Sequence, residues 1–231
     1  MIALLDGDLV LYRCAASAEN DPFGIATHRV NELVDLILER TQATEYRFFL
    51  SGKGNFRKKI YPEYKANRTQ EKPIHLQPLR EFACQELNAE VTEHELEADD
   101  YLGIHQTKDT VICSLDKDML QIPGLHYQWQ FGTAKWTKEE KFLDQSELEG
   151  SRLFYEQCLK GDVADNVKGI KGLGEKTATK LLKDCQTEKE MLDVCLEKYG
   201  HEDEFLMNAQ CLYILRDFED SYLKRYEGLI K

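Results

Sequence analysis

Acidic side chains form four short clusters whose composition and spacing could support metal-ion chemistry. Each cluster lies where a helix or strand is expected to begin or end. A single cluster of this kind usually caps a helix or carries surface charge. Two of the four follow apolar, strand-like runs, which favours convergence on one site. The clusters are Asp6 with Asp8, Glu97 with Asp99 and Asp100, Asp116 with Asp118, and Asp162 with Asp165.

Carboxylates gathered in this way need cations. Two of them about 5 Å apart, at an effective dielectric of about 20, repel by about 3 kcal/mol. Eight would outweigh a net stability of about 5–15 kcal/mol unless they take up protons or bind cations. Oxygen ligands without His or Cys favour Mg²⁺ or Mn²⁺ over zinc. Two such ions about 3.5–4 Å apart suit phosphodiester hydrolysis, because one activates water and the other stabilises the leaving oxygen.

The elements that must position these carboxylates can be predicted from apolar periodicity. Residues 2–5, 46–50 and 110–115 are expected to be strands, and residues 30–38 and 74–87 to be helices. This alternation predicts a mainly parallel α/β sheet over residues 1–144. If the first and third strands are parallel neighbours, the acidic pairs that follow them meet at one rim of the sheet.

The second half of the chain, residues 145–231, is predicted to be almost entirely helical. A glycine-rich turn at residues 169–174 separates two helical segments. Asp162 and Asp165 are three residues apart, so on a helix both would lie on the same face.

Two positive segments stand out against a net charge of −12. Residues 53–72 hold seven basic and two acidic residues, a balance of +5, with aromatic side chains between them. This mixture indicates phosphate neutralisation with base stacking, although a solvated amphipathic segment has the same composition. Residues 168–183 hold five lysines and one glutamate, a balance of +4. Gly172 and Gly174 precede a helix expected to begin at Glu175, so backbone N–H groups there could bind phosphate, or the glycines could form a simple tight turn.

Composition excludes several classes of protein. With 231 residues, 42% of them hydrophobic, the chain can bury a core, and its negative charge argues against a basic nucleic-acid coat or a membrane-surface protein. No apolar run reaches the roughly 20 residues of a membrane span, and the N-terminus has no signal-peptide pattern. The seven cysteines form no CxxC pair, so we expect reduced thiols. These features predict a cytoplasmic protein.

Five motifs, taken in order, resemble the 5′ nuclease family: flap endonucleases, the 5′→3′ exonuclease part of bacterial DNA polymerase I, and stand-alone phage exonucleases. The resemblance covers about residues 2–183, and the set of motifs is far more specific than any one of them. The motifs are residues 56–68, 97–100, 114–118, 161–166 and 169–178.

This resemblance implies a PIN-like α/β nuclease domain in residues 1–144, with an arch-like basic segment at 53–73. It also implies a helix–three-turn–helix within residues 145–231 that grips duplex DNA. The implied reaction is two-metal hydrolysis of DNA, as a 5′→3′ exonuclease or a 5′ flap endonuclease, with two Mg²⁺ or Mn²⁺ ions. The implied metal ligands are Asp6, Glu97, Asp99, Asp100, Asp116 and Asp118, with Asp162 and Asp165 contributing to the second ion.

The resemblance also assigns contacts to the substrate. Lys65 would be an electrostatic stabiliser, Tyr64 a stacking platform, and Arg68 a further contact near the 5′ phosphate. The glycine turn would grip duplex DNA with the help of K⁺. The expected partners are DNA 5′ ends, flaps and duplexes, together with replication proteins and no membrane, and the expected state is a monomer. A free-standing protein of this kind is expected in the cytoplasm of a bacterial or phage-infected cell. The implied DNA-binding residues are Arg57, Lys58, Lys168, Gly169, Lys171, Gly172, Gly174, Lys176, Thr177 and Lys180.

One position departs from the family pattern. Ser51 stands where the family usually has an Asp at the end of the second strand. Serine is a poorer ligand, and we hypothesise that Asp8 takes over part of this role. The stretch between Arg68 and Glu97 is also short for a long closed arch.

Two other functions remain as alternatives. The chain could be a non-catalytic DNA-junction binder with a defective metal site. It could also be a haloacid-dehalogenase-type phosphatase with Asp6 as nucleophile, since Asp8, Ser114 and Lys160 resemble the other motifs of that class. The phosphatase hypothesis leaves the glycine turn and residues 97–100 unexplained.

Overall fold

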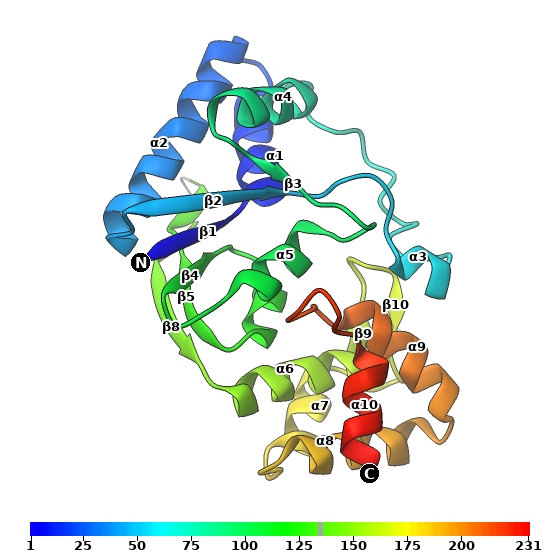
Figure 1. The fold of residues 1–231 in the computed structure, drawn as a ribbon. Helices are drawn as coiled ribbons and strands as arrows, with labels where there is room; N and C mark the ends of the chain where they lie inside the picture. The colour runs from blue at the N-terminus through cyan, green and yellow to red at the C-terminus, as the bar shows by residue number, and fades with distance from the viewer. Residues whose placement is uncertain (134–135) are drawn as a thin grey trace. The chain divides into compact units, whose positions relative to one another are not determined.

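The computed structural model describes residues 1–133 and 136–231 (Figure 1). The chain divides into two compact units. Unit 1 comprises Met1–Gly54, Gln70–Met119 and Gly124–Asp144, and unit 2 comprises Asn55–Thr69, Leu120–Pro123 and Gln145–Lys231. The basic segment 55–69 therefore belongs to the same unit as the C-terminal helices.

Unit 1 is built on a six-stranded, mainly parallel sheet with the strand order β3-β2-β1-β4-β5-β8. β1 pairs in parallel with both β2 and β4, so that Leu5 lies opposite Phe48 on one side and Cys113 on the other. This confirms the predicted α/β fold, and it meets the condition under which the acidic pairs after the first and third predicted strands lie at one rim of the sheet. The strands are β1 (Ile2–Asp6), β2 (Glu45–Leu50), β3 (Glu90–Val91), β4 (Thr110–Cys113), β5 (Gly124–Gln128) and β8 (Lys141–Gln145), and a separate antiparallel pair joins β6 (Phe131–Thr133) to β7 (Trp136–Lys138).

Helices cover both faces of this sheet. α1, α2 and α4 lie on one face and α5 on the other (Figure 1). Successive side chains of a strand point to opposite faces, so Leu5 and Phe48 join the core beneath α1 and α2. Phe49 instead contacts α5, with its ring 5.7 Å from that of Tyr101. The helices are α1 (Gly7–Ser17), α2 (Phe23–Thr41), α4 (Leu76–Glu86) and α5 (Ala98–His105).

Unit 2 is helical except for one short hairpin, β9–β10, in which Val167 lies opposite Asp162. Its core is aromatic, since Tyr155, Phe205 and Tyr222 are fully buried. The elements are α3 (Arg57–Ile60), α6 (Glu147–Lys160), β9 (Gly161–Asp162), β10 (Val167–Lys168), α7 (Glu175–Leu182), α8 (Glu188–Tyr199), α9 (Glu202–Leu212) and α10 (Tyr222–Ile230), while a 3₁₀ helix, η1 (Lys117–Gln121), starts in unit 1 and ends in unit 2.

The hairpin corrects one expectation. Asp162 ends β9 and Asp165 lies in the turn that follows, so the two are not on one helix face. The oxygen Oδ1 of Asp162 instead accepts hydrogen bonds from the backbone N–H groups of Ala164 and Asp165, at 2.7 and 3.2 Å. A short acidic side chain that bonds its own backbone favours a turn over a helix.

The cysteines are free, and six of the seven are buried. Among the described residues, no helix combines the length and apolar character that a membrane crossing requires.

Candidate functional site

Asp6 lies at the carboxyl end of β1, and its carboxylate is buried at 4% exposure. Its Oδ1 accepts the N–H of Leu9 at 3.0 Å and so caps α1, while Oδ2 accepts the hydroxyl of Ser114 at 2.6 Å. Burial raises the pKa of Asp6 to about 7, against the lowering effect of these two hydrogen bonds. The charges of Asp8 and Asp116 contribute to this increase, so this end of the sheet disfavours additional negative charge.

The loop after β4 places Asp116 at the same end of the sheet. The Ser114 hydroxyl, which donates to Asp6, also accepts the N–H of Asp116 at 3.0 Å. Asp116 Oδ1 in turn accepts the N–H of Asp118 at 2.9 Å, at the start of η1. One serine thus links the first and third acidic clusters, as the parallel pairing of β1 with β4 requires.

Helix α5 begins within the second acidic cluster. Glu97 is its N-cap, and Glu97 and Asp100 form a capping box in which each side chain accepts the other residue's backbone N–H. Asp100 is fully buried, and Asp99 lies in the same first turn. The hydroxyl of Ser51 accepts the N–H of Ala98 at 2.9 Å, so Ser51 helps to fix the start of this helix.

Asp8 is engaged by protein donors on both carboxylate oxygens. Arg80 on α4 donates to Oδ1, and the backbone N–H of Ser51 donates to Oδ2 at 2.9 Å. Arg80 also donates to the carbonyl of Ser51 at 2.6 Å. No sequence pattern marks Arg80 as part of a site, because an arginine on an amphipathic helix usually faces solvent.

In the conformation described, Asp6, Glu97 and Asp100 act as helix caps, and Asp8 is paired with Arg80. Over residues 1–133 and 136–231, no group of three or more His, Cys, Asp or Glu side chains is arranged to hold a metal ion. The donor set nonetheless has the chemistry of a hard-cation site, because every predicted ligand offers oxygen only. The metal ligands therefore stay a prediction.

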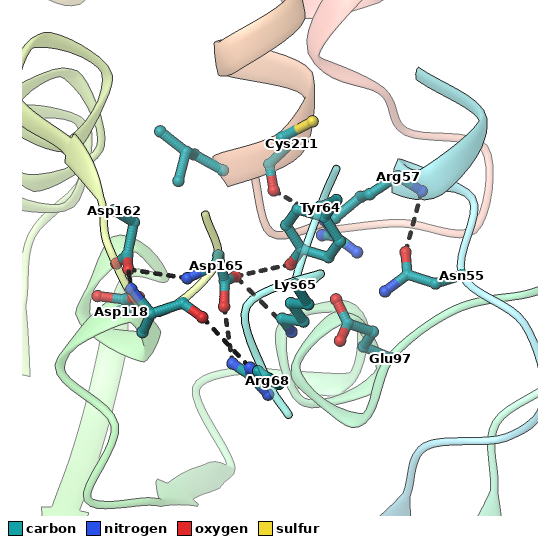
Figure 2. Close-up of polar contacts among 12 residues, drawn as sticks. Asn55, Arg57, Tyr64, Lys65, Arg68, Glu97, Asp118, Asp162, Asp165 and Cys211 are labelled. Atoms are coloured by element: carbon teal, nitrogen blue, oxygen red, sulfur yellow. Dashed lines mark hydrogen bonds and ion pairs between the residues drawn. The ribbon is translucent and has the colours of Figure 1, made fainter. Parts of the chain in front are cut away.

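Asp165 in unit 2 gathers three side chains from the basic segment (Figure 2). Its Oδ2 accepts the Tyr64 hydroxyl at 2.7 Å and lies 3.6 Å from the Lys65 ammonium. Its Oδ1 accepts from the Arg68 guanidinium at 2.7 Å. The three residues predicted to contact the substrate therefore lie together around one carboxylate.

The backbone of the basic segment is fixed at the same place. Lys65 has φ +57°, a left-handed conformation that non-glycine residues rarely adopt, and its N–H donates to the carbonyl of Asp165 at 2.9 Å. Asn67 donates to the carbonyl of Val163 at 2.6 Å, and Asn166 to that of Glu63 at 2.8 Å. These bonds, formed in both directions, hold the segment against the β9–β10 turn.

Tyr64 differs from the stacking platform implied by the family resemblance. Its side chain is buried at 2% exposure, and the Lys65 ammonium lies 4.9 Å from the ring centroid. The ring therefore supports Lys65 and its hydroxyl orients Asp165, so the structure does not present Tyr64 as an exposed stacking surface.

The glycine turn connects β10 to α7. A Cβ on Gly161 would lie 2.2 Å from the nitrogen of Gly169, and a Cβ on Gly169 would lie 2.1 Å from the carbonyl carbon of Lys160, so this approach requires glycine on both sides. Gly172 has φ +81°, and Gly174 is the N-cap of α7, which has no side-chain cap. Helix α7 therefore begins at Glu175, as predicted.

Most of the predicted DNA-binding residues lie on the surface, and Arg57 does not. Arg57 is 3% exposed, and its guanidinium donates to the backbone carbonyl of Cys211 (Figure 2). It also donates to the backbone carbonyl of Tyr213. Composition could not reveal this difference, because a buried arginine and an exposed one look alike in a basic run. The exposed members of the predicted set are Lys58, Lys168, Lys171, Gly172, Gly174, Lys176, Thr177 and Lys180, and Gly169 is half-buried.

Comparison with known proteins defines the class. Residues 1–149 match the family model of the 5′-3′ exonuclease N-terminal resolvase-like domain, and the chain therefore belongs to this family. It is an enzyme of the 5′ nuclease class, as the motifs predicted, and the family match leaves no support for the phosphatase alternative.

Individual relatives fall in the same class. The 5′-3′ exonuclease of Bacillus subtilis (strain 168) is 27% identical over 217 residues, covering 83% of this chain and 73% of that protein. The DNA polymerase I of Chloroflexus aurantiacus is 30% identical over 226 residues, covering 86% of this chain and 23% of the polymerase. The chain thus spans about a quarter of the length of that polymerase.

Solved structures show the same fold. The bacteriophage T5 5′-exonuclease with bound divalent zinc ions has a TM-score of 0.64 at 16% identity, over 91% of this chain and 88% of that one. The flap endonuclease-1 of Methanococcus jannaschii has a TM-score of 0.56 at 16% identity, over 100% and 84%. A complex of the T5 flap endonuclease with DNA and metal ions has a TM-score of 0.59 at 14% identity, over 99% and 97%.

Proposed function

We propose that this chain is a metal-dependent nuclease that hydrolyses DNA from 5′ ends or at 5′ flaps. The observation that carries the proposal is the family membership of residues 1–149. Two features of the chain support it: the acidic end of the unit 1 sheet, where Ser114 links Asp6 to Asp116, and the cationic cluster around Asp165 in unit 2. The first suits divalent ions, and the second suits a phosphate.

Mg²⁺ or Mn²⁺ is the metal that fits the donors of unit 1. Asp6 lies among like charges and is buried, so its ionised form is disfavoured until a cation is near. In this proposal Asp6, Asp116 and Asp118 hold the ion, with Glu97, Asp99 and Asp100 contributing from the start of α5. When bound, such an ion supplies the Lewis acidity that activates water and neutralises the leaving oxygen. The metal roles of Asp162 and Asp165, a second ion and K⁺ at the glycine turn remain predictions from the sequence.

Lys65 and Arg68 are the groups that we expect to neutralise the substrate phosphate. Both side chains are cationic. Their ion pairs with Asp165 and the left-handed backbone at Lys65 hold them in place. Groups fixed before the reaction stabilise developing negative charge at little reorganisation cost, which is the main electrostatic contribution in phosphoryl chemistry. Tyr64 acts through Asp165 and is a positioning residue in this scheme.

The glycine turn and the exposed lysines around it are the proposed contact with duplex DNA. The turn ends at the N-terminus of α7, whose first N–H groups suit a phosphate oxygen. Lys168, Lys171 and Lys176 are exposed around it and add charge. Such binding weakens as salt is raised, because it releases counterions from the DNA.

Cleavage of 5′-labelled flap, nicked and blunt duplexes, with Mg²⁺, Mn²⁺ or EDTA, tests the proposal. We expect short labelled products with either metal and none with EDTA. A mobility shift without cleavage under all metal conditions would instead favour the junction-binder alternative, and the product lengths would separate exonuclease from flap endonuclease action.

Asp116→Ala is the variant that tests the metal site. We expect it to abolish cleavage while duplex binding stays largely intact. Asp109→Ala is the control, because it removes an aspartate just before the opposite end of the same strand, β4, and should cut as the wild type does. Normal cleavage by Asp116→Ala would refute the metal assignment.

A further inference from the structure

One helix of unit 2, α9, holds both segments that are proposed to contact DNA. The carbonyls at its C-terminal end accept hydrogen bonds from a side chain of the basic segment. A side chain from its second turn donates to the residue just before the glycine turn. The α9 side of both contacts lies after residue 200, beyond residues 1–149 of the family match. The two side chains that make these contacts, Arg57 and Asn208, are not placed in the metal site or among the phosphate contacts of the proposed function.

Arg57 makes the first contact. Its Nε donates to the carbonyl of Cys211 at 3.0 Å and its Nη2 to that of Tyr213 at 2.7 Å. These carbonyls lie in the last turn and at the C-cap of α9, where helix carbonyls lack partners within the helix. A positive charge at this end also complements the helix dipole. The guanidinium lies over the Phe56 ring, 4.5 Å from its centroid, so the start of the basic segment is fixed to α9.

Asn208 makes the second contact. It is 2% exposed, and its amide donates to the carbonyl of Lys168 at 2.7 Å and to the hydroxyl of Tyr199 at 2.9 Å. The Tyr199 hydroxyl in turn donates to the carbonyl of Cys158 in α6. Lys168 is the last residue of β10 and comes directly before the glycine turn. Asn208 therefore fixes the point from which the turn departs.

We propose that α9 is a bracket that sets the spacing between the basic segment and the glycine turn, with Arg57 and Asn208 as positioning residues that do not touch DNA. The inference rests on the proposed duplex binding by the glycine turn. Its physical basis is that phosphates occur at fixed intervals along a duplex, so two binding elements add their affinities only when their separation is also fixed. This assignment replaces the predicted role of Arg57 as a DNA contact.

Asn208→Ala tests the connection to the glycine turn, with Gln210→Ala as the matched control. Gln210 lies on the same helix, and its amide donates within α9, to the carbonyl of Leu206 at 3.0 Å. We expect duplex affinity to fall about tenfold for Asn208→Ala, as for the loss of buried hydrogen bonds, and to be unchanged for Gln210→Ala. The slope of log affinity against log salt should also fall by about one for each phosphate contact that the turn loses. Asparagine is uncharged, so its removal takes away no phosphate contact directly. If Asn208 contributed only to the stability of unit 2, the slope would stay unchanged.

Arg57→Lys and Arg57→Gln test the connection to the basic segment. Lysine keeps the charge but cannot reach both carbonyls with a planar fork. We expect both variants to weaken flap binding to a similar degree. The proposal is overturned if Arg57→Lys binds as the wild type does and Arg57→Gln has a salt slope about one lower. These two results together would show that Arg57 contacts a phosphate. Lys58→Gln is the reference for such a contact, because Lys58 is exposed next to Arg57.

The outcomes separate the bracket from the proposed function. If the wild type shows no salt-dependent duplex binding, or Lys171→Gln binds as the wild type does, the duplex-binding proposal fails. If both behave as expected and Asn208→Ala matches Gln210→Ala, only the bracket is wrong.

Circular dichroism checks folding, and if Asn208→Ala does not fold, Tyr199→Phe replaces it. That variant removes the hydroxyl to which Asn208 donates, and we expect a smaller loss in the same direction. An unchanged affinity and slope for Tyr199→Phe would overturn the bracket.

Discussion

Arg80 and Asp8 form an ion pair that contacts the backbone of Ser51, the residue directly after strand β2. The guanidinium of Arg80 donates to the carboxylate of Asp8 and to the carbonyl of Ser51, and the N–H of Ser51 donates back to Asp8. The hypothesis that Asp8 replaces a metal-binding Asp at position 51 finds no support in this geometry. Asp8 instead carries a charge that the protein itself balances.

Asp8→Asn should therefore change stability more than metal affinity. Arg80 is only partly exposed, and losing its charged partner should lower the free energy of unfolding by about 1–3 kcal/mol. Mn²⁺ affinity, measured by calorimetry beside chemical denaturation, should stay close to that of the wild type. A large loss of Mn²⁺ affinity with unchanged stability would instead identify Asp8 as a ligand.

Ser51→Ala should weaken the start of α5. The Ser51 hydroxyl accepts the N–H of Ala98, which is one of the first N–H groups of a helix and has no partner within it. Loss of a hydroxyl in such a capping position costs about 1 kcal/mol, so urea denaturation should show a decrease of that size. Unchanged unfolding would mean that the helix start is held by the Glu97–Asp100 capping box alone.

Lys65→Ala should slow cleavage about a hundredfold or more, with a smaller effect on KM, because the proposed role is stabilisation of charge in the transition state. Lys59→Ala removes an exposed charge from the same segment and is the comparison. Single-turnover cleavage of labelled flap DNA measures both. A rate for Lys65→Ala within about twofold of the wild type would remove Lys65 from the site, since electrostatic stabilisation of this kind contributes far more.

Arg47 and Glu90 should make the β2–β3 edge sensitive to acid. Their two hydrogen bonds, at 2.7 and 2.6 Å, are the main reason that the pKa of Glu90 is lowered. The folded pKa lies below the unfolded one, so the stabilisation is complete above the ordinary glutamate value and is lost as pH falls through the folded pKa. Arg47→Gln should cost up to about 1 kcal/mol at neutral pH, since the pair is partly exposed. Denaturation at several pH values should show this difference shrinking in acid, and a difference that stays constant would exclude the ion pair as its source.

The sequence predicted the sheet better than it predicted the roles of individual carboxylates. Short apolar runs alternating with helical stretches were enough to predict a mainly parallel sheet with buried strands at β1 and β4. That these two strands are neighbours was a condition of the prediction, and the structure supplied it. Caps and metal ligands cannot be separated in this way, since both use a carboxylate at an element boundary. Glu97 and Asp100 form a capping box, and Asp162 closes a turn.

Long-range contacts were beyond the sequence for a different reason. Arg57 meets the carbonyl of Cys211, 154 residues away, and Asn208 meets that of Lys168, 40 residues away. No local pattern marks a side chain whose partner is a distant backbone carbonyl. The hairpin β9–β10 was also missed, because its strands have two residues each and show no alternation.

Diffraction from crystals soaked in Mn²⁺, with data collected for anomalous scattering, tests the central claim most directly. The account predicts an anomalous peak about 2.0–2.4 Å from carboxylate oxygens of at least two residues among Asp6, Asp116 and Asp118, as for an oxygen-ligated hard cation. It also predicts that the peak disappears in Asp116→Ala. The account would be contradicted if these carboxylates were well ordered with no anomalous density beside them, in crystals whose dissolved protein cleaves DNA with Mn²⁺.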